Sequence, residues 1–204
     1  EISLRYLLES GDFDNLDDAI NIAEYNSRHS LWLLLKKAKV SLSTSKIFLK
    51  AIEVGNTDII QTFLDLNITY NEIIIKGLHL AVYKDDFELA CLLFNSVKKL
   101  IDINEISTSL VVCHYELGKN QPNNFYYDNS GISLLMMAAG NGNLQLAKFL
   151  LKEGASLEQK DAIGQSALTY AVRNNQFAMT VFLHENHNAD LLVTNKNGEN
   201  LLHL

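Results

Sequence analysis

The 204-residue sequence contains one proline, two cysteines, Cys91 and Cys113, and no long apolar run. Because both cysteines lie in apolar, helix-like surroundings, they do not form the paired framework of a disulfide-stapled secreted domain. This usage favours a reducing, intracellular compartment. A transmembrane helix needs about 20 apolar residues, and the apolar run at 31–35 is far shorter. We therefore expect no direct insertion into a membrane.

Positive charge is also scarce, with 17 Lys and Arg against 24 Asp and Glu and a net charge of −7. This balance argues against nucleic acid or an anionic membrane as the main partner. No signal peptide is visible. The sequence begins at Glu1 rather than at methionine, so we expect a trimmed piece of a longer chain, and the missing signal carries no conclusion.

A repeat is present. Gly131, Gly164 and Gly198 each end a short polar turn, and they are spaced by 33 and 34 residues. A fixed period of this size predicts a stacked array of short helical units that forms one elongated domain.

Residues 128–156 show one unit most clearly, as a polar turn, a short helix, a break, an amphipathic helix and a glycine stop. Ser133 can cap the first helix, which stabilises it by about 1 kcal/mol. Ala138 and Ala139 are small enough for a neighbouring helix to approach closely. Gly142 and Gly154 can adopt the left-handed conformation that ends a helix.

This unit resembles the ankyrin repeat. The consensus positions are occupied by Asp128, Gly131, Leu135, Ala138, Ala139, Gly142, Leu150, Leu151, Gly154 and Ala155. The resemblance implies an all-α, ankyrin-type solenoid of stacked helix-turn-helix repeats with short hairpin turns. The consensus proline at the start of the inner helix is replaced by Leu134, Ala167 and Leu201, so we expect a less stable stack with the same fold.

The remaining chain predicts four regions. A diverged helical N-terminal cap spans 1–44, degenerate repeats span 45–118, an irregular insertion loop spans 119–130, and regular repeats span 131–204. The last repeat is truncated, so we expect the native protein to continue.

Helical spacing predicts the individual elements in the middle of the chain. Expected helices are 45–54, 57–66, 73–83, 87–97 and 106–117, and in the regular repeats 165–174 and 176–186. Gly55 and Asp85 are expected at the breaks between paired helices. No outer helix follows 106–117, so we expect one outer helix to be missing or replaced by a loop.

The insertion loop contains Phe125, Tyr126 and Tyr127. These aromatic side chains either cover the apolar face left by the absent helix or form an exposed recognition element. Both interpretations stay open at this point.

Nothing in the sequence predicts chemistry. Adjacent Cys113 and His114 would point about 100° apart on a helix, so they do not form a nucleophile and base. His184 and His187 lie three residues apart, but no further ligand completes a metal site. We expect no catalytic residue, metal or cofactor in this piece. Activity within 104–128 remains the weakest hypothesis.

The resemblance implies a scaffold that binds another protein through its hairpin tips and the exposed edge of its inner helices, and we expect a monomer. The tip positions are Asn129, Ser130, Ile132, Ala162, Ile163, Gln165, Lys196, Asn197 and Glu199. The inner-helix edge positions are Tyr83, Lys84, Asn141, Arg173 and Asn174. The apolar tips Ile132 and Ile163 either contact a partner or pack on a neighbouring hairpin. Arg173 is either an anchor for an acidic group or an ordinary surface arginine.

A second hypothesis makes the piece the targeting arm of a larger enzyme whose catalytic domain lies elsewhere. Abundant asparagine and isoleucine with almost no proline suggest an AT-rich genome. Diverged ankyrin proteins of bacterial pathogens act inside host cells, so the resemblance also raises an effector secreted into the host, with a role in virulence.

Overall fold

A computed structural model describes residues 42–66, 71–99, 102–104, 107–108, 131–187, 189, 196 and 198. The chain forms two compact units, Glu1–Gly77 and Leu78–Leu204. Nearly all of the predicted N-terminal cap and the whole insertion loop, with Phe125, Tyr126 and Tyr127, lie outside the described residues.

In the first unit, α4 (Leu42–Val54) packs against α5 (Thr57–Leu66). The rings of Phe48 and Phe63 are fully buried, with their centroids 5.5 Å apart. Gly55 lies between the helices with φ +75°, and the side chain of Asn56 accepts a hydrogen bond from the N–H of Ile59 to cap α5. The predicted helix pair and its break are confirmed.

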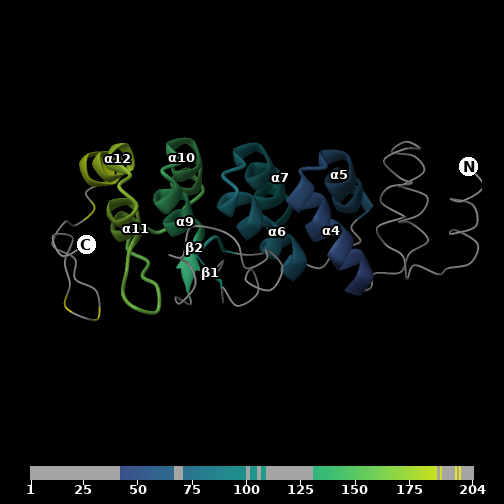
Figure 1. The fold of residues 1–204 in the computed structure, drawn as a ribbon, viewed down its shortest axis with the longest axis horizontal. Helices are drawn as coiled ribbons and strands as arrows, with labels where there is room; N and C mark the ends of the chain where they lie inside the picture. The colour runs from purple at the N-terminus through teal and green to yellow at the C-terminus, as the bar shows by residue number, and fades with distance from the viewer. Residues whose placement is uncertain are drawn as a thin grey trace, which may run out of the picture. The chain divides into compact units, whose positions relative to one another are not determined.

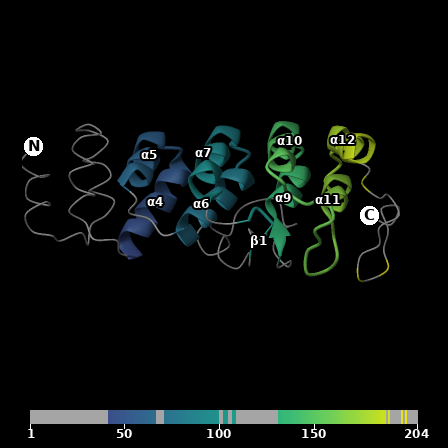
Figure 2. The same ribbon diagram turned by 180° about the vertical axis from the view of Figure 1, so that it is seen from behind.

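The second unit contains the end of α6 (Asn71–Tyr83) and the regular repeats. Its further elements are α7 (Phe87–Val97), β1 (Ser107–Thr108), β2 (Ile132–Ser133), α9 (Leu134–Asn141), α10 (Leu144–Lys152), α11 (Ala167–Arg173) and α12 (Phe177–His187). Inner helices α9 and α11 pack on each other, and each also packs on its own outer helix, α10 or α12 (Figures 1 and 2).

The same turn ends each inner helix of this unit. Asp85, Gly142 and Asn175 follow α6, α9 and α11 and all adopt a left-handed conformation, with φ +63°, +76° and +57°. After α9, the N–H of Gly142 donates to the carbonyl of Ala139, and the next N–H donates to the carbonyl of Ala138. These bonds satisfy carbonyls that a helix end otherwise leaves without partners.

Short polar side chains start the helices. The side chains of Ser133, Ser166, Asp86 and Asn143 accept a hydrogen bond from the N–H three residues later, at 3.2, 3.4, 3.0 and 2.8 Å. Each cap contributes about 1 kcal/mol. The predicted cap at Ser133 is confirmed, and the cap at Ser166 explains why α11 begins at Ala167 rather than at Gln165.

Small residues of the inner helix and aromatic residues of the outer helices build the core. Ala138 and Ala139 are completely buried in α9. The ring of Phe149 in α10 meets the edges or faces of Phe87 and Phe94 in α7, with centroids 6.1 and 5.6 Å apart. Outer helices α7 and α10 are therefore direct neighbours.

Two equivalent side-chain hydrogen bonds show where the sequence has additional residues between two repeats. Asn174 reaches a backbone carbonyl 34 positions earlier, at Gly140, whereas Asn141 reaches one 58 positions earlier, at Tyr83. The α9–α10 repeat therefore stacks directly on α7 and the end of α6, and the chain between these adjacent repeats is longer by 24 residues, the difference between 58 and 34.

The predicted helix 106–117 is wrong at its start. Ser107 and Thr108 form β1, which pairs antiparallel with β2 in the register Ser107 to Ser133 and Thr108 to Ile132. Apolar spacing favoured a helix there, but the backbone groups of these residues pair with the hairpin of the next repeat. The rest of 106–117 lies outside the described residues.

Candidate functional site

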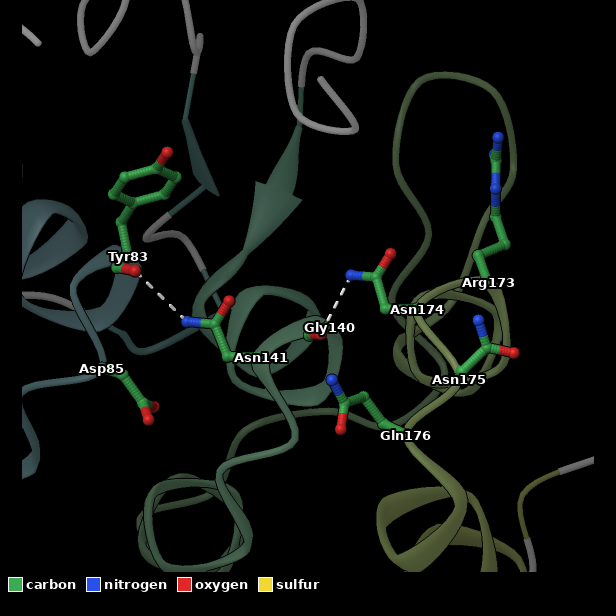
Figure 3. A pocket seen from close by; sticks show the side chains of 8 residues that line it. All are labelled: Tyr83, Asp85, Gly140, Asn141, Arg173, Asn174, Asn175 and Gln176. Carbon is green, nitrogen blue, oxygen red and sulfur yellow. Dashed lines mark hydrogen bonds between the residues drawn. The ribbon is translucent and has the colours of Figure 1, made fainter. Parts of the chain in front are cut away.

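A polar groove of about 470 Å³ crosses the second unit where three inner helices end (Figure 3). It is lined by Tyr83, Asp85, Gly140, Asn141, Arg173, Asn174, Asn175 and Gln176. We call this feature the inner-helix groove.

The groove has its shape because one repeat lacks a side chain where its neighbours have one. Tyr83, Gly140 and Arg173 each lie two residues before a left-handed break residue, so they are equivalent positions of α6, α9 and α11. Figure 3 shows Tyr83 on one wall, Arg173 on the other and Gly140 between them. The missing side chain leaves a depression one repeat wide.

Two asparagines form the floor and clamp the repeats together. The Asn141 side-chain amide donates to the carbonyls of Val82 and Tyr83 at 2.9 and 3.3 Å. The Asn174 amide donates to the carbonyl of Gly140 at 2.9 Å. Each bond joins the end of one inner helix to the end of the previous one, so the floor is fixed before any partner binds.

Side chains beside the floor are also held. Asn143, the cap of α10, donates through its Nδ2 to Oδ1 of Asp85 at 2.7 Å. The Gln176 amide lies so close to Gly142 that a Cβ atom at Gly142 would overlap it. Asp85 and Gln176 are therefore both in contact with the α9–α10 repeat.

Helix ends give the groove an uneven charge. The C-terminal end of a helix carries a partial negative charge, which a basic residue in the last turn offsets. Arg173 is such a residue in α11, and Lys84 directly follows the last residue of α6, whereas α9 has none. Among the lining residues, Asp85 supplies the carboxylate and Arg173 the guanidinium.

The chain between α10 and α11, which we call the finger, is anchored to α11. Oδ1 of Asp161 accepts the N–H groups of Ile163 and Gln165 at 3.0 and 2.7 Å, and Oδ2 accepts the hydroxyl of Tyr170 in α11 at 2.9 Å. The N–H of Lys196 donates to the carbonyl of Ile163 at 2.9 Å. The finger is therefore held to α11 and to the next turn of chain.

A sequence model of ankyrin repeats, in three copies, matches residues 78–195, more than half of the chain. The chain belongs to the ankyrin-repeat family. Palmitoyltransferase akr1 of Neurospora crassa is similar to it, at 37% identity over 79 residues. That match covers 39% of this chain and 11% of the enzyme, so the chain spans about a tenth of its relative's length.

The inner-helix groove brings together most of the residues that were predicted to form the inner-helix edge. Tyr83, Asn141, Arg173 and Asn174 line it, whereas Lys84 is exposed outside the lining. Two of these residues, Asn141 and Asn174, use their amide N–H groups within the protein, which the sequence did not reveal.

The ankyrin fingertips differ from the prediction at two positions. Ala162 and Lys196 are exposed and Ile163 is half-buried, but Ile132 and Gln165 are 0% and 1% exposed. Both buried residues directly follow a turn glycine, and Ile132 pairs with β1. Their side chains are buried within the unit, and the burial of Ile132 favours the packing interpretation.

Several predicted residues are not placed. Asn129, Ser130, Asn197, Glu199, Cys113 and His114 lie outside the described residues. Sequence reasoning in turn missed Gly140, Asp85, Asn175 and Gln176 as groove residues. Gly140 lies two positions before the break residue Gly142, as Tyr83 and Arg173 lie before Asp85 and Asn175, so this shared offset is the one sequence signal that pointed to Gly140.

Two histidines, His184 and His187, make local contacts near the end of α12. The Nδ1 of His184 lies 3.0 Å from the carbonyl of Ala189, and the ring of His187 packs edge-on against Phe182. Burial, with a smaller contribution from Glu153, raises the pKa of the Cys91 thiol. Among described residues, three His, Cys, Asp or Glu side chains never gather in a possible metal site, and helices there are too short or polar to cross a membrane.

Proposed function

We propose that this ankyrin-repeat chain is a scaffold that binds a segment of another protein along the inner-helix groove, with Ala162, Ile163 and Lys196 as further contacts on the fingers. The observation that carries the proposal is the continuous groove over three repeats, with its floor fixed by Asn141 and Asn174. A preformed site loses little conformational entropy on binding.

The chemistry of the lining favours recognition over catalysis. Amides, one carboxylate, one guanidinium and one phenol line the groove. Such groups pair with the main chain and polar side chains of a partner. A nucleophile activated by a neighbouring base, which covalent catalysis needs, is not among these lining residues.

The first test fills the groove without removing a contact. Gly140→Arg places in α9 the side chain that Arg173 carries at the equivalent position of α11, and Gly140→Ala is the matched control. We expect the wild-type chain and Gly140→Ala to retain the same protein from a eukaryotic lysate and Gly140→Arg to lose it, while circular dichroism shows that all three chains are folded. Equal retention by all three chains would exclude the groove as the binding site.

The relative favours a second candidate function, because its name identifies an enzyme and the match covers only 11% of it. In this version the ankyrin repeats are the targeting arm of a larger enzyme, and the chemistry lies outside residues 1–204. The full-length protein would then show activity that Gly140→Arg lowers toward a bound protein substrate but not toward a small one. An inactive full-length protein that still binds its partner would exclude this version.

Cellular context remains part of the proposal. A monomer in a reducing, intracellular compartment fits the unpaired thiol of Cys91. The bacterial effector interpretation has no support in the family match or in the fungal relative, and the scaffold role does not depend on it.

A further inference from the structure

The two walls of the inner-helix groove carry opposite charge. Asp85 lies on the wall formed by the end of α6, and Arg173 lies on the wall formed by the end of α11 (Figure 3). Gly140 of α9 lies between them and contributes no side chain. A partner that crosses the groove therefore meets an anion first and a cation second.

The Asp85 wall suits a basic side chain. Asp85 is exposed, and its Oδ1 accepts a hydrogen bond from Asn143, so its second oxygen, Oδ2, can accept one from a partner. The aromatic ring of Tyr83 lies on the same wall, and aromatic faces attract cations. The end of α9, without a basic residue in its last turn, adds partial negative charge, whereas Lys84 directly follows the end of α6.

The backbone supports a specific use of this carboxylate. Break residues Gly55 and Gly142 have no side chain, which is the easiest solution at φ near +75°. Asp85 adopts φ +63° at the equivalent position and carries its carboxylate into the groove. Asn175 likewise lines the groove at φ +57°, so two of these four break residues carry a polar side chain where glycine would be least strained.

The Arg173 wall suits an acidic side chain. A guanidinium is always charged, and its planar fork of N–H donors matches a carboxylate. The amides of Asn175 and Gln176 lie on the same wall and can donate further hydrogen bonds. Both walls are held apart by the middle repeat, so their spacing is fixed.

This spacing sets the length of the bound segment. Packed helices lie about 8–10 Å apart, so α6 and α11, separated by α9, are about 16–20 Å apart. An extended chain rises about 3.3 Å per residue, so about five or six residues cross that distance, and long side chains reduce the number to about four.

We propose that the groove selects an extended protein segment with a lysine or arginine at the Asp85 wall and an aspartate or glutamate at the Arg173 wall, about four to six residues apart. The main chain of this segment crosses above Gly140. This inference rests on the proposed scaffold function and defines the chemistry of its partner.

The test selects peptides from a random display library on the wild-type chain and removes those that also bind Gly140→Arg. We expect the remaining peptides to share one basic and one acidic residue at this spacing. Two variants then test each wall separately. Asp85→Asn keeps an acceptor for Asn143 and tolerates the left-handed backbone, so it removes only the charge.

We expect Asp85→Asn to weaken the selected peptides about tenfold, and replacement of their basic residue by alanine to have no further effect on that variant. Selection on Arg173→Glu should replace the acidic residue by a basic one. The inference would be overturned if the groove-dependent peptides lacked the charge pair. It would also be overturned if Arg173→Glu still selected peptides with the acidic residue. Either result would leave the scaffold function intact. A library without any groove-dependent peptide would overturn both.

Discussion

The side-chain amide of Asn174 donates to the backbone carbonyl of Gly140 at 2.9 Å and so joins the ends of two successive inner helices. Asn141 makes the same connection to the repeat before. Both residues lie at the edge where ankyrin repeats present side chains to partners. Their first role here is to hold adjacent repeats in register.

Substitution of Asn174 should therefore lower stability. We expect Asn174→Ala to reduce the free energy of unfolding by about 1–2 kcal/mol, because the carbonyl of Gly140 loses a partly buried partner. Urea denaturation followed by circular dichroism measures the change. Asn175→Gly is the control, since it removes a neighbouring amide and relaxes φ +57°, and it should stay within about 0.5 kcal/mol of wild type. Equal stability of Asn174→Ala and wild type would show that the bond is not maintained in solution.

The two glycines near the groove should respond in opposite directions to alanine. Gly142 has φ +76° and lies against the Gln176 amide, so Gly142→Ala should destabilise by about 1–3 kcal/mol. Gly140 lies within α9, where alanine is favoured over glycine, so Gly140→Ala should stabilise by up to about 1 kcal/mol. Thermal melts of both variants provide the comparison.

Adding Gln176→Ala separates the two causes at Gly142. The second substitution removes the overlap but not the strained backbone, so it should recover only part of the loss. Complete recovery would mean that φ at this position contributes nothing.

Alanine substitutions at the two fingertip isoleucines should have different effects on stability. Ile132 is completely buried, so Ile132→Ala should cost about 2–5 kcal/mol. Ile163 is half-buried, so Ile163→Ala should cost about 1 kcal/mol or less and act mainly on partner binding. Denaturation midpoints and affinity for a selected peptide distinguish these effects. Similar stability losses would indicate that both tips pack equally.

Local chemistry explains which elements the sequence predicted. Helices α5 and α7 have the expected bounds, because Asn56 and Asp86 cap them and break residues Gly55 and Asp85 precede the caps. These signals lie within a few residues of the feature that they determine.

The missed features depend on contacts that are distant in sequence. Ser107 and Thr108 join a strand because β2 lies 25 residues later, and Gln165 is buried although its position in a turn favoured exposure. The groove itself needs the alignment of α6, α9 and α11 in space, with a glycine in the middle helix. Neighbouring sequence alone does not contain that alignment.

The Cys91 thiol should be less reactive than a thiol in an unfolded chain. Burial first, and Glu153 second, raise its pKa, so less of the reactive thiolate is present at a given pH. Because the folded pKa is higher, the associated stability is present at neutral pH and is lost as pH rises through that folded pKa. Alkylation by iodoacetamide across alkaline pH, read by mass spectrometry on the Cys91 peptide, measures the midpoint. Glu153→Gln should lower it slightly, and a midpoint at or below that of the unfolded chain would contradict the expectation.

The finger beside the groove should become more mobile when the hydrogen bond between Tyr170 and Asp161 is removed. Tyr170→Phe removes the hydroxyl that Oδ2 of Asp161 accepts and keeps the ring, which is 2% exposed. The carboxylate then loses a buried donor, so we expect a loss of about 1–3 kcal/mol. Hydrogen exchange gives the local readout, because the N–H groups of Ile163 and Gln165 donate to Oδ1 of the same carboxylate and should exchange faster. The N–H of Ala147 in α10 donates to the carbonyl of Asn143 and should keep its rate. Uniform acceleration at both places would show that Tyr170 stabilises the whole unit rather than positioning the finger.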